Sequence, residues 1–302
     1  MATLLDLTQQ GDVGTVSDDA YLKRTLRLMG PQQLYELWER QQWQSQAIEL
    51  ERDKKQWAAI PDEEKEDHLW GLSSFFVGEE RVTTQFSALV MAYEDEQEEA
   101  FLTTQQVDEA RHMQFFDRYY REVFALDERD IRSRLQRVRE NVTPAFVTLF
   151  DENLVEECRR LIENPADVAA KVDFITTYHM AIEGVLALTG QHFMLEYYEK
   201  NDLMPGFVEG FSNIARDEHR HVAYGTWFLQ QKLAQDESLK QRVQDKLMEL
   251  LPVAAGVLVP PGYQLGDDYE FFGYTSKQQT EYAFTALTRR LKVIGVGLPV
   301  AA

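Results

Sequence analysis

Two nearly identical pentads limit what this chain can fold into more than any other feature. They read DEARH at 108–112 and DEHRH at 217–221. Both lie in long stretches of helical periodicity that contain few Gly or Pro residues. In an α-helix the Glu and the His of each pentad, three positions apart, share one face. The pattern therefore predicts two helices that each present a Glu-x-x-His pair.

Each pentad is preceded by a long helical stretch that carries a Glu inside an apolar segment. Glu79 lies in FFVGEERV (75–82) and Glu183 lies in HMAIEGVL (179–186). A chain that runs about 14 residues along one helix, turns and runs back covers roughly 21 Å each way. Each leading Glu can therefore lie level with the Glu-x-x-His pair that follows it. The half-bundle occurs twice, as a degenerate internal repeat.

Two adjacent acids in the first of these segments compete for the inward position. Glu79 and Glu80 are 100° apart on a helix, so only one of them faces the core. Glu79 shares its face with Phe75, Val82 and Phe86. Glu79 is therefore the predicted inward residue.

Four antiparallel helices with four Glu and two His in their core predict an all-α four-helix bundle with a di-metal carboxylate site. Carboxylate oxygens bridge metal ions, and imidazole suits iron and manganese. Four carboxylates also balance two divalent ions, whereas four buried Glu without metal would have to take up protons. The alternative is two helical ion-pair clusters without metal. The predicted metal ligands are Glu79, Glu109, His112, Glu183, Glu218 and His221.

The other charged residues of the pentads have predicted supporting roles. Asp108 and Asp217 can accept the outer ring N–H of a ligand His on the facing helix and fix its tautomer. Arg111 and Arg220 lie three residues after these Asp residues and could pair with them. The remaining His residues are expected at surface or ordinary core positions, and His179, one turn before Glu183, is the exception to watch. The others are His68, His192 and His219.

The composition excludes several classes of protein. The net charge of −20 disfavours phosphate backbones and anionic membranes, so a nucleic-acid partner is not expected. Cys158 is the only Cys, which excludes an internal disulfide and a thiolate-rich metal site. The first residues do not resemble a signal peptide, and no apolar run is long enough to span a bilayer. A cytoplasmic location is the expectation.

The pattern along the chain predicts one domain over residues 1–302, with a core at about 61–233 and additional N- and C-terminal helices. Residues 1–18 are polar and are expected to be flexible. Strand signals are weak throughout. Periodicity and breakers place helices at 31–42, 61–96, 101–123, 142–163, 165–200, 206–233, 236–259 and 276–293.

The order Glu, Glu-x-x-His, Glu, Glu-x-x-His resembles the small subunit of ribonucleotide reductase and, more closely, the ribonucleotide-reductase-like ligand-binding oxidases, which are ferritin-like. The similarity covers about residues 32–255 and includes ELERDKKQWAAIPDEEK, GEERVT, DEARH, TYHMAIEGVLALTG and RDEHRHVAYGTW. The resemblance implies that the six residues named above bind manganese and iron, or two iron ions, and react with molecular oxygen. It also implies a long-chain fatty acid in an apolar tunnel and a homodimer.

The resemblance further implies an ether cross-link beside the metals, between Val82 and Tyr178. Val82 lies three residues after Glu79, on the same helical face. Tyr178 lies five residues before Glu183, about 140° round an ideal helix, so the alignment requires a π-bulge. The alternative interpretation is that Tyr178 is a core aromatic residue.

Three functions from different classes are compatible with this pattern. The favoured one is an oxidase that attacks C–H bonds with a two-electron oxidant in a dry pocket. The alternative is a radical-generating small subunit of ribonucleotide reductase. Against it, Phe116 stands where such subunits carry a Tyr, and the chain ends VGLPVAA without their Tyr-containing tail. Against the oxidase, Gln191 stands where that family often has Tyr. A non-enzymatic iron-handling protein is disfavoured by the long aromatic-rich chain and its extra C-terminal helices.

Overall fold

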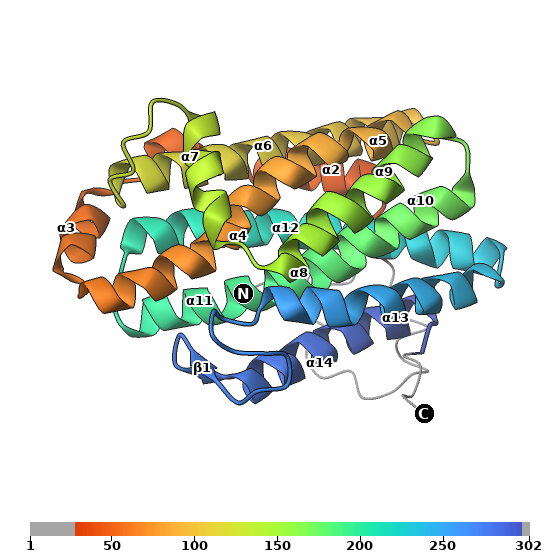
Figure 1. The fold of residues 1–302 in the computed structure, drawn as a ribbon. Coiled ribbons are helices and arrows are strands. Elements are labelled where there is room, and N and C mark those ends of the chain that lie inside the picture. Colours follow the sequence, from red (N-terminus) through yellow and green to blue (C-terminus); the bar gives the residue numbers. More distant parts are fainter. Residues whose placement is uncertain (1–27, 298–302) are drawn as a thin grey trace.

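Four long helical stretches lie side by side in the computed structural model, which describes residues 28–297 (Figure 1). The first two are α4 (Asp62–Gln85) and α6 (Glu96–Glu122). The third is continuous through α10 (Val168–Ile175), the π-helix η5 (Thr176–Ala187) and α11 (Leu188–Lys200), and the fourth is α12 (Pro205–Gln235). Residues of α4 contact α6, residues of η5 contact α12, and α6 contacts α12. The predicted all-α architecture is therefore confirmed for the described residues.

Local sequence signals explain where these helices begin. The side chain of Asp95 accepts hydrogen bonds from the backbone N–H groups of Gln97 and Glu98 at the start of α6. Asp167 caps α10 in the same way, and Pro205 occupies the first turn of α12. The two Asp caps and the first-turn proline mark where three of the four stretches begin.

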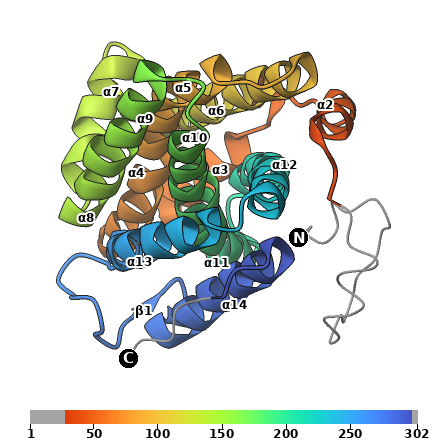
Figure 2. The same ribbon diagram turned by 90° about the vertical axis from the view of Figure 1, so that its right-hand side faces the viewer.

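Shorter elements surround the four long stretches (Figures 1 and 2). They are α2 (Pro31–Arg40), η2 (Ser45–Ala47), α3 (Glu51–Ala59), α5 (Ser87–Met91), α7 (Ile131–Val138), η3 (Arg139–Asn141), α8 (Pro144–Phe146), the π-helix η4 (Val147–Asn153), α9 (Leu154–Glu163), α13 (Leu239–Val257) and α14 (Ser276–Ile294). A hairpin of β1 (Glu270–Phe271) and β2 (Tyr274–Thr275) precedes α14 and pairs Phe271 with Tyr274. Figure 2 shows α13, α14 and β1 on one side of the bundle, next to α11.

Several boundaries differ from the sequence prediction. The helix expected at 61–96 ends as α4 at Gln85, and the short helix α5 follows it after Phe86. The helices expected at 142–163 and 165–200 each contain a π-helical segment. Residues 1–18, for which flexibility was expected, lie outside the described residues. No helix within 28–297 combines the length and the apolar character needed to cross a membrane.

The bundle core is rich in aromatic side chains and closely packed. Phe115 and Phe116 of α6 are fully buried. Phe115 contacts Phe207 of α12, and Phe116 contacts Phe211 of the same helix. Gly210 permits this contact, because a Cβ atom there would lie only 2.2 Å from the Phe115 ring. The missing side chain lets α12 lie close to α6, and the two pentads therefore face each other.

Candidate metal centre

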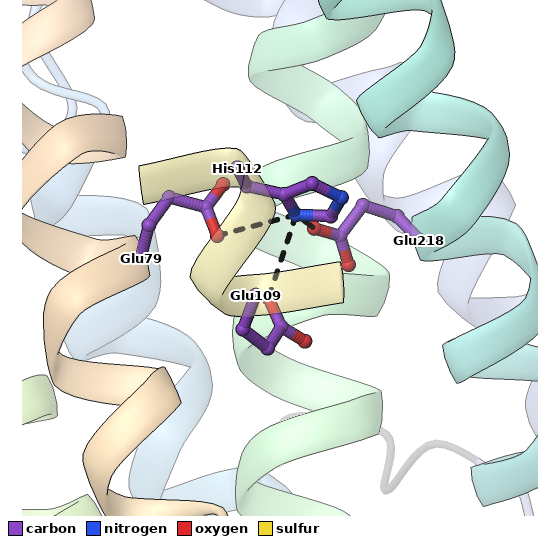
Figure 3. A group of neighbouring side chains, drawn as sticks. All are labelled: Glu79, Glu109, His112 and Glu218. Carbon is purple, nitrogen blue, oxygen red and sulfur yellow. Dashed lines mark ion pairs between the residues drawn. The ribbon is translucent and has the colours of Figure 1, made fainter. Parts of the chain in front are cut away.

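Six buried side chains from the four long stretches converge in the middle of the bundle and form two overlapping groups. Within each group the candidate ligand atoms lie within 4.8 Å of one another. Figure 3 shows the first group, in which Glu79 comes from α4 and the other members from α6 and α12. The groups are Glu79, Glu109, His112 and Glu218, and Glu109, Glu183, Glu218 and His221. Glu109 and Glu218 belong to both groups, which is the arrangement expected of carboxylates that bridge two ions.

The two His rings turn the same nitrogen toward the carboxylates. His112 Nδ1 lies 3.4 Å from Glu79 Oε2 and 3.5 Å from Glu218 Oε1. His221 Nδ1 lies 3.3 Å from both Glu183 Oε1 and Glu218 Oε2. Each ring therefore presents Nδ1 to a set of carboxylate oxygens and leaves Nε2 for other partners.

Glu80 takes a different position from its neighbour Glu79. Glu79 is 5% exposed and points into the site, as Figure 3 shows. Glu80 is half-buried and pairs with Arg81, with 3.2 Å between Nη1 and Oε2. The structure thus brings Glu79, and not Glu80, to the centre of the bundle.

The π-helix η5 changes the angular relation between Tyr178 and Glu183. In a π-helix the hydrogen bonds run from residue i to residue i+5, so residues five apart lie near one face. Tyr178 and Glu183 are five apart, and η5 contains both. Tyr178 Oη donates a hydrogen bond to Glu109 Oε1 at 2.5 Å. The π register therefore brings Tyr178 to the carboxylate cluster, where an ideal α-helix would turn it away.

Asp side chains lie behind each His, in a crossed arrangement between α6 and α12. Asp217 Oδ2 of α12 lies 3.3 Å from Nε2 of His112, on α6. Asp108 Oδ2 of α6 lies 3.3 Å from Nε2 of His221, on α12. An acceptor on Nε2 favours the tautomer that leaves the Nδ1 lone pair directed at the carboxylate cluster.

Arg residues neutralise this Asp pair. Arg111 Nη1 lies 3.1 Å from Asp108 Oδ1, within the same helix. Arg220 Nη2 lies 2.5 Å from Asp217 Oδ1 and 2.9 Å from Asp108 Oδ2, and so joins the two helices. Both Asp residues are fully buried, and burial of such carboxylates is tolerable because each is paired and hydrogen-bonded.

Two Trp residues complete the polar surroundings, and the sequence analysis did not identify them. Trp38 Nε1 donates to Asp108 Oδ1 at 2.9 Å, and Trp43 Nε1 donates to Asp217 Oδ2 at 2.7 Å. Trp38 lies in α2 and Trp43 follows this helix. The only signal in the sequence is a pair of Trp residues five positions apart, which does not indicate their distant partners.

Burial and the neighbouring charges shift the pKa values of the ionisable groups in the site. Burial raises the pKa of Glu79 to about 8, and burial together with Glu218 raises the pKa of Glu183 well above its usual range. Burial opposes protonation of His112, but Glu79 and the other carboxylates raise the pKa of that ring well above its usual value. Without metal ions, the cluster therefore retains protons on some carboxylates and on its His rings. Divalent cations would displace these protons.

The donor set fits a pair of transition-metal ions. Three buried atoms, Glu79 Oε2, Glu183 Oε2 and His112 Nδ1, have no hydrogen-bond partner among the described residues. Oxygen and imidazole donors of this kind suit iron and manganese. Cys158 is not in either group, so thiolate ligation does not contribute.

One flank of the cluster opens on an apolar cavity. Val82, Tyr178 and the four Glu residues line its inner end. Trp70, Gly71, Phe271 and Phe272 lie at the other end, and apolar residues such as Ile182 and Leu186 line the wall between the two ends. A carboxylate cluster next to such a cavity provides a dry space in which a reactive oxidant is protected from water.

The remaining His residues lie outside both groups. His68 is buried and its Nδ1 lies 2.5 Å from Tyr198 Oη. His192 stacks on Tyr282, and His219 Nδ1 lies 2.5 Å from the backbone oxygen of Ala215. None of these residues belongs to a candidate metal group.

His179 lies close to the site without joining it. Its Nε2 lies 3.3 Å from the side-chain amide of Gln105, and Gln105 Nε2 donates to Glu183 Oε1 at 3.2 Å. Burial lowers the pKa of His179 well below its usual value. Gln105 is a further residue that sequence reasoning missed; it lies four residues before Glu109, one turn along α6.

Fold and site together define a class: an all-α bundle with a buried carboxylate and histidine site that can hold two metal ions. The family described as "Ribonucleotide reductase, small chain" matches residues 29–258. The chain therefore belongs to the ribonucleotide reductase small chain family.

Solved structures of R2-like ligand-binding oxidases resemble the chain over most of its length. A mutant with an anaerobically reconstituted Mn/Fe cofactor is 25% identical, with a TM-score of 0.76 over 88% of this chain and 93% of that one. The R2-like ligand-binding oxidase from Sulfolobus acidocaldarius is also 25% identical, with a TM-score of 0.73 over 90% of this chain and 92% of that one. A form with an aerobically reconstituted Mn/Fe cofactor is 25% identical, with a TM-score of 0.74 over 87% of this chain and 92% of that one. The predicted ferritin-like fold is thereby confirmed.

Proposed function

We propose that this protein is a di-metal carboxylate oxidase, an oxidoreductase that uses molecular oxygen for two-electron oxidation of a C–H bond. One observation carries the proposal: two groups of ligand atoms share Glu109 and Glu218 and lie at the inner end of an apolar cavity. The similarity to oxidases that contain a Mn/Fe cofactor supports it. The cofactor is accordingly manganese with iron, or two iron ions.

The proposed ligand assignment follows the two groups. Glu79 and His112 would hold one ion, and Glu183 and His221 would hold the other. Glu109 and Glu218 could contribute to both sites, because they belong to both groups. When bound, such a pair of ions supplies activation of oxygen as a two-electron oxidant. Asp217 and Asp108 would hold the His rings in the ligating tautomer.

The ether link between Val82 and Tyr178 is the second part of the proposal. Both side chains line the cavity beside the four Glu residues, and Tyr178 Oη already contacts Glu109. The reaction breaks the tertiary Cβ–H bond of Val82 and the O–H bond of Tyr178 and forms one Cβ–O bond. The two protons and two electrons released would convert one molecule of oxygen to hydrogen peroxide, and the bound metal ions would supply the activation of oxygen.

The cross-link is tested by mass. Aerobic loading with manganese and iron should lower the intact mass by about 2 Da, through the two-electron oxidation that such centres support. Val82→Ala and Tyr178→Phe should each abolish the change and keep both metals. Val77→Ala and Tyr120→Phe are matched controls, because both residues are buried outside the cavity. A fully loaded protein with unmodified Val82 and Tyr178 would refute the cross-link.

The occupant of the cavity is proposed from its chemistry. Its inner end carries carboxylates that would bind metal, and most of its wall is apolar. A fatty acid suits such a cavity, because its carboxylate can bind a metal ion while its chain contacts the wall. The resemblance to the ligand-binding oxidases also motivates the homodimer, and the single Cys motivates the cytoplasmic location. Both stay predictions.

The metal assignment is tested by a crystal grown aerobically with both metals. Anomalous scattering at the manganese and iron edges should show two ions between the six ligands. A single ion, or ions bound elsewhere, would overturn the proposed function.

Family membership supports one other function, a radical-generating subunit for ribonucleotide reduction. The resemblance implies that radical-bearing subunits carry a Tyr one turn after the first ligand His, which is position 116 in this chain. Phe116 is fully buried and packs on Phe75 and Phe211. It has no phenolic oxygen, so we expect no persistent tyrosyl radical from this position after exposure to oxygen. A persistent tyrosyl doublet in the electron paramagnetic resonance spectrum, with support of ribonucleotide reduction, would favour this alternative.

A further inference from the structure

We infer that a groove between α11 and α14 binds an aryl carboxylate, a small molecule in which a short chain joins a planar ring to a carboxylate group. The two helices contact each other and lie side by side in Figure 2. The groove has about 760 Å³ of free space, within the range of roughly 300–1,000 Å³ that is typical of small-molecule sites. We name it the α11–α14 groove, and the lining residues that matter here are His192, Phe193, Tyr282, Ala286, Arg289 and Arg290.

The α11–α14 groove is separate from the candidate metal centre. None of the six candidate metal ligands lines it. Among the described residues, Phe193 is the only one that it shares with the apolar cavity beside the carboxylate cluster. The inference therefore goes beyond the proposed function and does not depend on which metal ions the cluster holds.

A buried guanidinium without a carboxylate partner carries the inference. Arg290 is 5% exposed and lines the groove. Its Nη1 donates to the backbone oxygen of Gly184, but within residues 28–297 its Nε has no hydrogen-bond partner and no Asp or Glu forms an ion pair with it. Burial lowers the pKa of Arg290 to about 10. Because a buried charge is costly unless it is paired, the groove offers a site for an anion.

The other buried Arg side chains show what Arg290 lacks. Arg134 and Arg220 are the only other Arg residues that are buried in the described part of the chain. Arg134 donates to both carboxylate oxygens of Asp117, at 2.7 and 3.0 Å. Arg220 pairs with Asp108 and Asp217, as described above. The fold thus supplies carboxylates to two buried guanidinium groups and leaves the third facing the groove.

Acidic residues around the groove limit the charge of its ligand. Glu196, Glu199 and Glu281 line it, and Glu196 Oε1 lies 2.6 Å from Lys200 Nζ. These carboxylates repel a ligand with several negative charges more strongly than a ligand with one. A carboxylate with a single charge therefore suits Arg290 better than a doubly charged phosphate ester does.

Aromatic side chains line the groove two helical turns before Arg290. Tyr282 is eight residues away, or about 12 Å along the axis of α14. The ring of His192 stacks on Tyr282 with 4.1 Å between centroids, and Phe193 lies 5.5 Å from Tyr282 and 4.7 Å from Tyr274. Surfaces of this kind favour contact with a planar ring.

A small residue lies between the aromatic rings and the cation. Ala286 lines the groove four residues after Tyr282 and four before Arg290, on the same face of α14. Its methyl group leaves the space between them open. A ring joined to a carboxylate by a two-carbon chain can therefore contact both Tyr282 and Arg290.

The test is a titration of the metal-loaded protein by isothermal calorimetry with indole-3-propionate, its neutral amide and propionate. We expect the acid to bind about tenfold more tightly than the amide, the effect of one hydrogen bond between charged groups. Propionate, which lacks the ring, should bind about tenfold more weakly than indole-3-propionate. Equal affinities of the wild-type protein for the acid and the amide would overturn the inference.

Arg290→Met removes the charge and keeps much of the length of the side chain. The preference for the acid over the amide should disappear in this variant, and Arg290→Lys should restore part of it. A purely structural role of Arg290 would instead lower both affinities equally. Arg129→Met is the matched control, because the Arg129 side chain is 91% exposed and does not line the groove. Full preference for the acid in Arg290→Met would overturn the inference.

A second variant tests the groove without loss of the cation. Ala286→Leu should fill the space between Tyr282 and Arg290 and weaken the binding of the acid and the amide alike. Thr288→Leu is its control, since Thr288 is an exposed residue of α14 that does not line the groove. Unchanged binding of both probes in Ala286→Leu would place them elsewhere and overturn the inference.

A last arm separates the groove from the metal centre. A carboxylate can also bind metal ions, so the titration is repeated after treatment with a chelator, with metal content measured in the same samples. Binding of indole-3-propionate should persist without metals. Binding that requires metals would assign the probe to the metal centre, and would overturn this inference while leaving the oxidase proposal intact. A protein that retains no metals before chelation but still binds the acid through Arg290 would instead refute only the proposed function.

Discussion

The two flanks of the carboxylate cluster have opposite chemistry. Behind the His rings, Asp108 and Asp217 are held by Arg220 and by the indole N–H groups of Trp38 and Trp43. On the opposite flank the cluster faces an apolar cavity. The polar flank is held by directional hydrogen bonds and ion pairs, whereas the apolar flank is a cavity lined mostly by apolar side chains.

This difference separates two requirements of an oxygen-activating site. Ligand geometry must be held by groups whose own positions are fixed by hydrogen bonds. A reactive oxidant also needs a dry space that admits a substrate. Because each requirement has its own flank, a change on the polar flank should alter metal binding, and a change on the apolar flank should alter the ligand or the cross-link while both metals stay bound.

The largest effect is expected where the flanks meet, at the shared carboxylates. Glu109→Ala and Glu218→Ala each remove a residue common to both groups, so metal content should fall from two ions per chain to one or none. Elemental analysis after loading and desalting measures this. Glu80→Ala is the control, because Glu80 pairs with Arg81 outside the site and two ions should remain. Full metal content in Glu109→Ala would contradict the shared-ligand assignment.

A smaller effect is expected one layer out on the polar flank. Asp217→Asn keeps the shape of the side chain but removes the charge that faces His112 Nε2. Loss of such a partner typically lowers metal affinity roughly 10–100-fold. Competition with a chelator measures the change. Asp245→Asn, at an exposed position of α13, should leave the affinity unchanged. Equal affinities for the two variants would show that the polar flank does not tune the metals.

The pH dependence of the metal-free protein tests how burial acts on the cluster. Burial raises the pKa of Glu79 from its usual 4.5 to about 8. Between these values the unfolded chain has released this proton while the folded chain retains it, so stability should fall as pH rises. The contribution of Glu79 is therefore greatest below pH 4.5 and is lost as pH approaches 8.

Glu79→Gln tests the contribution of this carboxylate. The amide stays neutral, so the urea midpoint measured in chelator should fall less steeply from pH 5 to pH 8 than in the wild-type protein. The variant also removes a carboxylate that raises the pKa of His112, which flattens the curve in the same direction. Identical slopes for variant and wild type would show that Glu79 does not carry the pH dependence.

Much of the centre was predictable because its residues lie in regular α-helices. The pentads occupy α6 and α12, where residues three apart share a face, and the structure brings Glu109, His112, Glu218 and His221 together. The choice of Glu79 used the same periodicity. Charge and ligand chemistry then indicated metal ions, without any knowledge of how the helices pack.

The features that sequence reasoning missed depend on other kinds of information. A π-helix differs from an α-helix in its hydrogen-bond register, so periodicity could indicate that Tyr178 needs one but not that η5 extends over Thr176–Ala187. Trp38 and Trp43 meet partners 70 and 174 residues away, and no local spacing encodes these pairs. The ring contact between Trp70 of α4 and Phe271 of the β1–β2 hairpin likewise joins two residues that are about 200 positions apart in the sequence.

The smallest effect should come from the indole donors, which act on the metals only through Asp residues. Trp43→Phe removes the hydrogen bond to Asp217 Oδ2, the same oxygen that faces His112, whereas Trp38 donates to the Asp108 oxygen that does not face His221. A hydrogen bond to a charged acceptor contributes about 1.5 kcal/mol or somewhat more. Trp43→Phe and Trp38→Phe should therefore each lower the free energy of unfolding in urea by roughly this amount. Metal affinity should fall only in Trp43→Phe, and by less than tenfold, because Asp217 keeps its charge and its contact with Arg220. Equal losses of affinity in both variants would show that the shared oxygen has no special role and that the indoles act on the polar flank only as packing.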